Sequence, residues 1–356
     1  MKVLVVGAGF SGATVAQQHV ERGDQVTVID KRDHIAGNAF TDNMDGQLVH
    51  VYGPHIFHTD SDDVWNYVNR FVKFQRYTHQ VRAVGADHKT YSLPFSLLTF
   101  NQLFGTSSPG EAKKRILAET KDFRGSDSNV EGWCLKNLGK TLYETLIEGY
   151  TGKQWGRDPK HLDSSIIKRL PVRFDDSNAD YFNDAHQGIP EGGYTALVET
   201  MLKGSEVFLG VSGGPELFKD YSLVYYTGPL DQLNKFELGK LESRSLRFDR
   251  YVGETQGCAQ LNDCTIAVPH TRTSESWLIG RNKKPEKIWI VKETPDSSAE
   301  PAYPINDDKN NSLQQRYVKL SKQKFPNVVP VGRMATFRYL DMHQAIAQAL
   351  KAVRER

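Results

Sequence analysis

The sequence has few of the features that mark secreted, membrane-bound or nucleic-acid-binding proteins. Its 356 residues include only three cysteines (Cys134, Cys258 and Cys264), which form no CxxC pair. Lys plus Arg number 45 and Asp plus Glu 43, so no charge excess calls for a polyanionic partner. No stretch approaches the roughly 18 apolar residues of a membrane-spanning helix, and the N-terminal apolar run lacks the flanks of a signal peptide. We therefore expect a cytoplasmic protein with no nucleic-acid or membrane partner.

Residues 1–30 carry a pattern of strand, glycine-rich turn, helix and second strand. An apolar run leads into Gly7, Gly9 and Gly12, a helical pattern follows, and a second apolar strand ends on Asp30. The first glycine permits a tight turn, the second lets a pyrophosphate approach the backbone, and the third lets helix and strand pack closely. The helix N-terminus offers N–H groups to phosphate, and Asp30 can accept from ribose hydroxyls. We favour a dinucleotide site over a plain glycine-rich turn.

The next two segments leave alternatives open. Residues 31–40, which include Lys31 and Asn38, suit the adenylate and pyrophosphate of FAD or a solvated loop equally well. His55 and His58 lie three residues apart, but no carboxylate or cysteine stands at ligand spacing from them. We therefore expect packing or hydrogen bonding to a ligand here, and no metal.

Two later segments combine aromatic or apolar residues with cations. In Tyr150–Pro159, glycines flank an aromatic residue and two cations, which fits a mobile lid or, more often, an ordinary surface loop. Arg169 and Arg173 lie four residues apart in an apolar setting, so they need anionic partners. A diphosphate would serve, although internal carboxylates are the more frequent partners.

The C-terminal region predicts a strand at 328–331, a loop with Arg333, and a helix that begins at Asp341. Asp341 is a good N-cap, and that helix end can face a flavin or its ribitol and phosphates. An N-terminal fingerprint closed by a C-terminal strand, Gly-Arg turn and helix is typical of FAD enzymes of the glutathione-reductase type. The sequence therefore predicts an α/β fold with a discontinuous Rossmann-like FAD domain, a helical domain and an antiparallel β-sheet domain.

Periodicity gives the expected domain boundaries. Residues 62–71 and most of 97–150 have helical spacing, whereas 80–84, 90–94, 207–209 and 223–228 have the pattern of strands. We expect the FAD domain at 1–75, 190–235 and 325–356. A helical domain should cover 95–165, including the segment near 150–160, for which a mobile loop (a lid) and an ordinary surface loop are both open. The antiparallel sheet and substrate domain should cover 76–94, 166–189 and 236–324.

Longer motifs extend over most of the chain: GAGFSG, YGPHIFHT, EGYTGKQWGRDP, SIIKRLPVRF, YFND…QGIPEGGYT, YYTGPLDQ, QGCAQLN…VPHTR, AYPIND and VGRMATFRYLDM. With these motifs the chain resembles the UDP-galactopyranose mutase family. The resemblance implies a redox-neutral interconversion of UDP-galactopyranose and UDP-galactofuranose, in which N5 of reduced FAD attacks the anomeric carbon and expels UDP. It further implies a homodimer that serves cell-surface polysaccharide biosynthesis.

The resemblance also implies roles for individual residues. Arg169 and Arg272 would clamp the diphosphate, and His58 would lie beside flavin and sugar. The other expected substrate contacts are Tyr150, Trp155, Tyr181, His79, Arg244, Tyr303 and Tyr339. The expected FAD contacts are Gly7, Gly9, Phe10, Ser11, Gly12, Asp30, Lys31, Asn38, His55, Arg333, Asp341 and Met342.

Several positions depart from the family pattern. An asparagine expected to reach the ligand is His79, VPYTR is VPHTR with His270, and Ala302, Leu146 and Ile147 replace aromatic residues. These changes lie on the nucleotide-sugar side, so the substrate could instead be UDP-N-acetylgalactosamine or dTDP-fucose. Two other classes remain open. One is a flavin oxidoreductase with net substrate oxidation, and the other is a non-catalytic nucleotide-sugar sensor.

Overall fold

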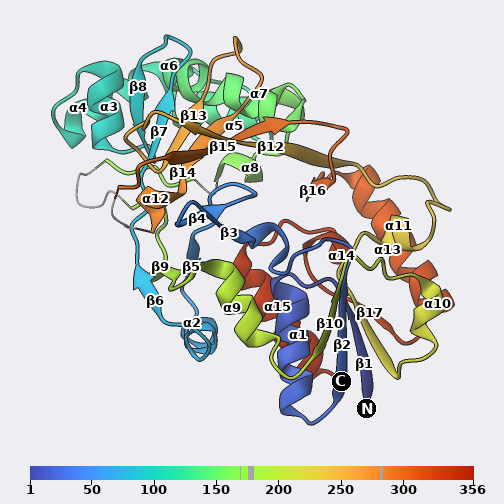
Figure 1. The fold of residues 1–356 in the computed structure, drawn as a ribbon. Helices are drawn as coiled ribbons and strands as arrows, with labels where there is room; N and C mark the ends of the chain where they lie inside the picture. The colour runs from blue at the N-terminus through green and yellow to red at the C-terminus, as the bar shows by residue number, and fades with distance from the viewer. Residues whose placement is uncertain (169, 175–179, 281–283) are drawn as a thin grey trace.

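The computed structural model describes residues 1–168, 170–174, 180–280 and 284–356, and it has two lobes (Figure 1). The lower lobe contains a five-stranded parallel sheet in the order β10-β2-β1-β11-β17. Its strands are β1 (Lys2–Val6), β2 (Gln25–Asp30), β10 (Glu206–Leu209), β11 (Leu223–Tyr226) and β17 (Val328–Pro330). The sheet thus joins three separate stretches of the chain, and the predicted return of the C-terminal strand to the N-terminal unit is confirmed.

Alternation along β1 explains how helices cover both faces of this sheet. Val3 and Val5 point into one apolar cluster, and Leu4 points into another. The first cluster lies under α1 (Phe10–Glu21), α9 (Gly193–Met201) and α15 (Met342–Arg354). The second lies under α10 (Pro215–Phe218), α11 (Leu230–Leu233) and α13 (Asp308–Lys324) (Figure 1). Burial on both faces requires the continuous apolar run that the sequence shows.

The position of α13 corrects one predicted boundary. We expected residues 236–324 to belong to the substrate domain, but Tyr317 of α13 is fully buried in the same cluster as Leu4 and Tyr226. The Tyr317 hydroxyl also donates to the Gly239 carbonyl, at 2.5 Å. Helix α13 therefore packs with the parallel sheet, because its apolar side chains find their partners there.

The upper lobe contains a seven-stranded sheet in the order β16-β12-β15-β14-β13-β7-β8 (Figure 1). Neighbouring strands are antiparallel as predicted, except that β13 and β7 run parallel. The strands are β7 (Val81–Val84), β8 (Thr90–Leu93), β12 (Ser243–Gly253), β13 (Gln260–Asp263), β14 (Arg272–Glu275), β15 (Ile288–Pro295) and β16 (Pro301–Pro304).

Smaller elements connect the two lobes. A three-stranded sheet has the order β5-β9-β6, so residues 186–189, which we expected in the antiparallel sheet and substrate domain, pair with β5 and β6 and not with the seven-stranded sheet. A two-stranded sheet pairs β3 with β4. These elements are β3 (Thr41–Met44), β4 (Gln47–His50), β5 (Phe57–Thr59), α2 (Asp62–Asn69), β6 (Phe74–Arg76), β9 (His186–Pro190), α12 (Ser276–Ile279) and α14 (Arg333–Thr336).

The helical region packs against the end of the seven-stranded sheet. It comprises α3 (Leu97–Phe104), α4 (Pro109–Thr120), α5 (Val130–Asn137), α6 (Lys140–Leu142), a π-helical turn (Tyr143–Ile147), α7 (Glu148–Trp155) and α8 (Ser165–Lys168). Within the described part of the chain, no helix combines the length and apolarity needed to cross a membrane.

Helix α7 corrects the prediction of a loop at 150–159. Residues 150–155 of that segment are helical, and the glycines next to the two ends of α7 have defined roles. A Cβ on Gly149 would lie 2.1 Å from the Cys264 carbonyl oxygen, so this glycine allows the helix to contact the sheet closely. Gly156, with φ of +61°, ends the helix. Whether this segment moves stays a prediction.

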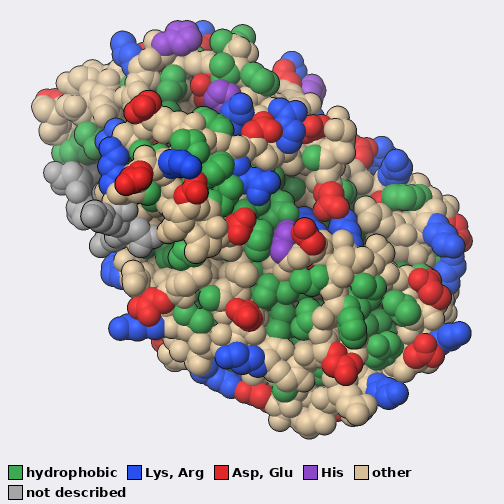
Figure 2. Space-filling view, viewed as in Figure 1, with side chains coloured by type: hydrophobic (Ala, Val, Ile, Leu, Met, Phe, Trp, Pro, Cys, Tyr) green, Lys and Arg blue, Asp and Glu red, His purple; other side chains and the backbone are tan. Residues whose placement is uncertain are grey.

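The surface view shows both signs of charge scattered over the two lobes, with hydrophobic side chains gathered in the hollow between them and on the lower lobe (Figure 2). This distribution agrees with the near balance of 45 basic and 43 acidic residues. No single-sign surface dominates this face of the molecule.

The glycine turn generates a stability prediction. A Cβ on Gly12 would lie 1.9 Å from the Gly7 carbonyl oxygen. Gly12→Ala should therefore lower the free energy of unfolding by about 1–3 kcal/mol. Gly110→Ala, in the first turn of α4 with nothing within 4 Å, should be neutral or stabilising by up to about 1 kcal/mol. Urea unfolding followed by circular dichroism measures both, and equal effects would contradict the close-packing role of Gly12.

Candidate active site

The turn after β1 forms an open backbone cradle. Gly7, with φ of +109°, leaves no room for a Cβ, which would lie 1.9 Å from Thr227 Oγ1. The Gly9 turn faces the Gly37 turn, and a Cβ on Gly9 would lie 3.7 Å from the Gly37 Cα. Asp30 accepts hydrogen bonds from the backbone of Ala8 (2.7 Å) and Arg32 (2.9 Å), which fixes the turn next to the helix N-terminus. Such a cradle admits a phosphate against the backbone.

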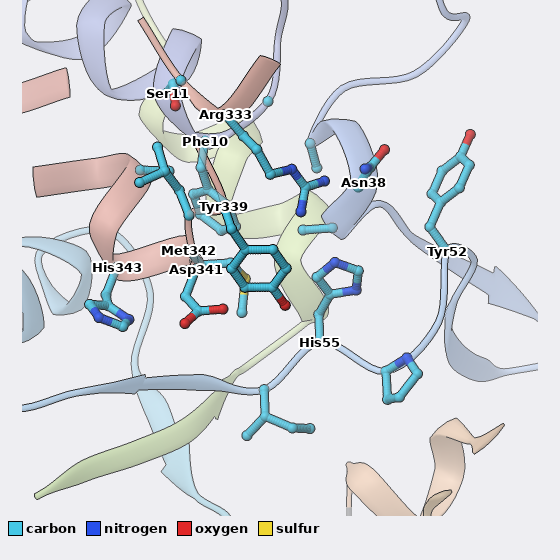
Figure 3. A pocket seen from close by; sticks show the side chains of 18 of the residues that line it. Phe10, Ser11, Asn38, Tyr52, His55, Arg333, Tyr339, Asp341, Met342 and His343 are labelled. Carbon is cyan, nitrogen blue, oxygen red and sulfur yellow. The ribbon is translucent and has the colours of Figure 1, made fainter. Parts of the chain in front are cut away.

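A cavity of about 320 Å³ opens from this turn (first cavity). Figure 3 shows Arg333, Tyr339 and His55 pointing toward one central space, with Asn38 and Tyr52 on one side and Asp341 and His343 on the other. The N-termini of α1 and α15 both reach this wall, through Phe10 to Gly12 and Met342 to His343. Two helix N-termini and an arginine together favour an anionic ligand.

A cavity of about 120 Å³ lies on the other side of a shared wall (second cavity). Its own lining comes from α7 and from apolar side chains of the helical region, including Tyr150, Gln154, Trp155, Leu146 and Ile147. The wall common to both cavities consists of Tyr181, Gln260, Arg272, Tyr303 and Tyr339. A ligand in the first cavity and a ligand in the second would therefore meet at the same guanidinium.

Arg272 is held at this wall by a buried carboxylate. Its Nε lies 2.6 Å from Glu293 Oε1, and the Glu293 side chain is fully buried. Burial alone would lower the pKa of Arg272, but the Glu293 carboxylate raises it well above the usual range. Gly53, with φ of +82°, covers the carboxylate so closely that a Cβ would lie 2.2 Å from Oε1. The cation is therefore permanent and its position is fixed.

Tyr303 and Tyr339 complete the shared wall. Their rings stack with centroids 5.8 Å apart and an interplanar angle of 16°. The Arg333 guanidinium lies 5.1 Å from the Tyr303 ring centroid on the side of the first cavity. Burial raises the pKa of Tyr303. The Tyr303 hydroxyl thus stays protonated and can donate a hydrogen bond to an anionic ligand.

His79 takes part in a buried polar chain. Its Nε2 lies 3.1 Å from Gln260 Oε1, and Gln260 Nε2 donates to Asn262 Oδ1 at 2.8 Å. The proton of His79 therefore lies on Nε2, and Nδ1 faces the Tyr77 hydroxyl at 3.4 Å. Burial lowers the pKa of His79 to about 4. His79 is a neutral imidazole whose two nitrogens both point to protein groups.

A stack of three rings joins His79 to His58. Phe182 lies parallel to His58 at 3.8 Å and to His79 at 6.1 Å, measured between ring centroids. His58 Nδ1 lies 2.9 Å from Asp184 Oδ2. Its Nε2 has no partner among the described residues, and the ring lines the first cavity, so it can face a ligand there.

The comparisons with known proteins agree with this geometry. Residues 145–339 match the family model described as UDP-galactopyranose mutase, and residues 5–71 match an NAD(P)-binding Rossmann-like domain. A "Probable UDP-galactopyranose mutase" of Klebsiella pneumoniae is 41% identical and covers 99% of this chain and 94% of the relative. The chain belongs to the UDP-galactopyranose mutase family. It is therefore a member of a family of mutases.

Two further similarities bear on substrate and fold. A dTDP-fucopyranose mutase of Escherichia coli is 38% identical over 98% of this chain and 97% of the relative. The structure of a reduced UDP-galactopyranose mutase superimposes with a TM-score of 0.76 at 14% identity, covering 99% of this chain and 95% of that chain. A putrescine oxidase reaches 0.59 at 14% identity, covering 100% of this chain and 99% of that chain. At these identities the structural matches show the fold alone.

The structure brings most of the residues expected from the family together. The first cavity is lined by Gly9, Phe10, Ser11, Gly12, Asn38, His55, His58, His79, Arg333, Asp341 and Met342. The shared wall holds Tyr181, Arg272, Tyr303 and Tyr339, and the second cavity holds Tyr150 and Trp155. Arg169, the other half of the expected diphosphate clamp, lies outside the described residues.

Four expected site residues line neither cavity. Gly7 and Asp30 shape the turn behind the first cavity, and Lys31 pairs with Glu300 at 2.5 Å. Arg244 was expected to contact substrate, but its Nε donates to the Gln154 carbonyl (3.0 Å) and its Nη2 to the Lys153 carbonyl (3.2 Å). The partial negative charge of the α7 C-terminus attracts this guanidinium, and its contact with substrate stays a prediction.

The structure also adds residues that sequence reasoning missed. Gln260 and Asn262 alternate along β13, so a strand with polar side chains on one buried face was a usable signal. Gln154, on the α7 face that lines the second cavity, could have been found from helical spacing with Tyr150. Glu293 and Phe182 carried no local signal, because their roles depend on partners distant in sequence.

The burial of His79 predicts a pH dependence of stability. Its pKa is about 4 in the folded protein and 6.5 in the unfolded chain. The unfolded chain therefore binds the proton first, and stability falls as the pH drops from 6.5 toward 4. Between pH 7 and 5, the loss of unfolding free energy should be about 1–2 kcal/mol smaller in His79→Gln than in wild type. His161→Gln, at an exposed histidine, is the control, and identical pH profiles for His79→Gln and wild type would contradict the burial effect.

Proposed function

We propose that the protein is a flavin-dependent mutase that interconverts the pyranose and furanose forms of a nucleoside diphosphate hexose. UDP-galactopyranose and UDP-galactofuranose are the first candidates, as the name of the Klebsiella relative suggests. The observation that carries the proposal is the meeting of two cavities at one partly buried arginine. A cofactor site and a nucleotide-sugar site that share a cation suit a reaction in which a diphosphate leaves next to the cofactor.

The residues of the first cavity fit FAD bound in the manner of the glutathione-reductase type. The glycine turn cradles a pyrophosphate, Arg333 supplies a positive charge, and the α15 N-terminus offers N–H groups to the ribityl chain. Asp30 stands at the end of β2, where a ribose is expected. Reduced FAD bound here would supply N5 as the nucleophile toward the anomeric carbon, without net electron transfer.

The chain's own residues bind and orient the nucleotide sugar. Arg272 carries the charge that offsets the diphosphate as it becomes a leaving group, and Tyr303 and Tyr339 donate hydroxyl hydrogen bonds to it. Arg169 is proposed as a second cation for the same group. Tyr150 and Tyr181 offer aromatic faces to the nucleoside, and Trp155 covers the second cavity and excludes water.

The side chain at position 79 gives one structural clue to which sugar is bound. Both ring nitrogens of His79 are hydrogen-bonded to protein groups. The ring therefore presents a C–H edge where an asparagine would present an amide. A site without that amide tolerates a sugar with one hydroxyl fewer, because no polar group is left unpaired. The similarity to a dTDP-fucopyranose mutase points the same way. A 2-acetamido hexose is the third candidate.

We also propose that the enzyme is a cytoplasmic homodimer that supplies furanose sugars for cell-surface polysaccharide. The balance of charge and the three buried, free cysteines are compatible with that location. The division into FAD, helical and sheet domains, with α13 moved to the FAD domain, is part of the same proposal.

The mutase proposal predicts activity that requires reductant but does not consume it. Protein loaded with FAD and reduced by dithionite should convert UDP-galactofuranose to UDP-galactopyranose, detected by HPLC. Turnover should be near zero in air, because only the reduced flavin has a nucleophilic N5. Stoichiometric sugar oxidation would indicate an oxidoreductase, and binding of the nucleotide sugar without turnover would indicate a sensor.

Removing the Arg272 guanidinium should reduce kcat by roughly 30- to 1,000-fold, as expected from losing about 2–4 kcal/mol of transition-state stabilisation. Because Arg272→Met alone would leave Glu293 buried and unpaired, the test uses Arg272→Met combined with Glu293→Gln. Arg247→Met, at an exposed site, is the control. The FAD content of the double variant and of the control should equal that of the wild type. Near wild-type turnover in the double variant would remove Arg272 from the reaction.

A substrate panel tests the role of His79. Reduced wild-type enzyme is compared with His79→Asn on UDP-galactose, UDP-N-acetylgalactosamine and dTDP-fucose by kcat/KM. Restoring the amide should shift preference toward the fully hydroxylated hexose by about 10-fold or more. If both proteins prefer UDP-galactose by the same wide margin, the departure at His79 does not determine specificity.

A further inference from the structure

Helix α7 forms one wall of the second cavity. Contacts along the helix and just past its C-terminal end fix its position. Along the length of the helix, Gly149 lies against the Cys264 carbonyl, and Lys153 Nζ donates to the carbonyls of Val268 (3.2 Å) and His270 (2.8 Å). The Thr271 hydroxyl donates to Gln154 Oε1 at 3.0 Å. All these partners belong to the β13–β14 connection, in the same lobe as α7.

Two arginines make the contacts at and just past the C-terminal end of α7. Arg244 donates to the last carbonyls of α7, and a Cβ on Gly156 would lie 2.7 Å from its Nη1. Two residues after Trp155, Arg157 extends a guanidinium toward two carboxylates. Its Nη2 lies 2.7 Å from Glu242 Oε2, and its Nη1 lies 3.3 Å from Asp307 Oδ2.

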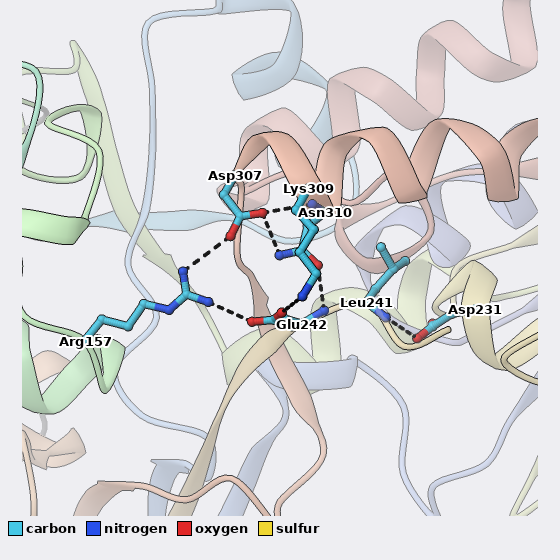
Figure 4. A network of polar contacts seen from close by, with 7 residues as sticks. All are labelled: Arg157, Asp231, Leu241, Glu242, Asp307, Lys309 and Asn310. Atoms are coloured by element: carbon cyan, nitrogen blue, oxygen red, sulfur yellow. Dashed lines mark hydrogen bonds and ion pairs between the residues drawn. The ribbon is translucent and has the colours of Figure 1, made fainter. Parts of the chain in front are cut away.

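The two carboxylates lie next to the first turn of α13, which packs in the Rossmann-like lobe. Asp307 is the N-cap of α13, and its Oδ1 accepts from the backbone and the side chain of Asn310, each at 2.8 Å. Asn310 is fully buried, and its Oδ1 accepts from the backbone of Glu242 at 3.0 Å. Figure 4 shows the resulting ring of contacts through Arg157, Glu242, Asn310 and Asp307.

This ring is anchored in the core of the Rossmann-like lobe. The residue before Glu242 is Leu241, whose N–H donates to the buried carboxylate of Asp231 at 2.9 Å. Tyr317 of α13 lies in the same apolar cluster as β1 and β11. The Arg157 contacts therefore tie the end of α7 to the lobe that carries the first cavity.

We propose that Arg157 is a positioning residue that latches the Trp155 end of α7 onto Glu242 and Asp307, and so sets the wall of the nucleotide cavity. Arg157 lines neither cavity, so it acts through the position of Trp155 and Gln154. Its side chain and those of its partners are each about one-third exposed, at 32%, 38% and 34%. The latch is therefore weak enough to open and sensitive to salt.

The inference rests on the proposed function only for the choice of ligand, so the test combines UDP binding with a measurement that needs no ligand. In Arg157→Ala, the Kd of UDP for the FAD-loaded protein should rise roughly 3- to 10-fold, as expected for two partly exposed ion pairs. The KM of the nucleotide sugar should rise similarly, while kcat changes less than about 2-fold. Amide hydrogen exchange of 148–158 should speed up without UDP, and Arg157→Lys should recover part of each effect.

Two other variants control the experiment. Lys160→Ala removes the same charge three residues further on, where the ion pair with Asp158 stays within the loop, and should leave UDP affinity and exchange unchanged. Glu242→Gln with Asp307→Asn breaks the latch from the other side and keeps the N-cap oxygen, so it tests the idea even if Arg157→Ala fails to fold.

The two parts of the test separate the two proposals. If the wild type does not bind UDP, the proposed function fails and hydrogen exchange alone decides on the latch. Unchanged exchange of 148–158 in Arg157→Ala and in the double variant would overturn the latch. Faster exchange with unchanged UDP affinity would overturn its role in positioning the cavity wall.

Discussion

The arrangement of this molecule depends on one ion pair, in which the partly buried Arg272 meets the fully buried Glu293. The two residues lie directly opposite each other on β14 and β15, so strand pairing itself brings their side chains together. Desolvating two charges is costly, and the pair persists because each group compensates the other. The turn at Gly53 then closes over the carboxylate. The part of the Arg272 side chain that is not paired with Glu293 lines both cavities.

This constraint explains why the site lies between two lobes rather than inside one. The parallel sheet supplies the glycine turn, Arg333 and the α15 N-terminus, whereas the seven-stranded sheet supplies Arg272, Gln260 and Tyr303. Neither lobe alone provides both a cofactor cradle and a cation at the leaving group. The helical region adds the last wall through α7, which contacts the β13–β14 connection along its length and the Rossmann-like lobe through Arg157, just past its end. Cofactor, diphosphate and nucleoside can then occupy a single path along the shared wall.

Much of this could be predicted from the sequence, because the signals were local. The fingerprint of residues 1–30 and the Asp341 cap are short-range patterns, and both occur as predicted. Where a residue's role is set by distant packing, prediction failed. Gly152 and Gly156 suggested a loop at 150–159, yet residues 150–155 are helical and Gly156 is the residue that ends the helix.

The packing of α13 could not be predicted for a related reason. Periodicity identifies a helix but not the sheet that it covers. Helix α13 packs on the parallel sheet because Tyr317 is buried in the same apolar cluster as that sheet. Arg244, which we expected to contact substrate, donates to the last carbonyls of α7 in this structure, and its contact with substrate stays a prediction. Glu293 was invisible in the sequence, since a buried carboxylate is recognised only from its partner.

The central claim is that the two cavities form one site with Arg272 at their junction. A crystal structure of the FAD-loaded, reduced protein with UDP tests it most directly. We predict diphosphate oxygens at about 3 Å from the terminal nitrogens of Arg272, uracil in the second cavity, and Arg272 Nε still against Glu293. UDP bound elsewhere, or an Arg272 side chain turned away from the diphosphate, would contradict the account.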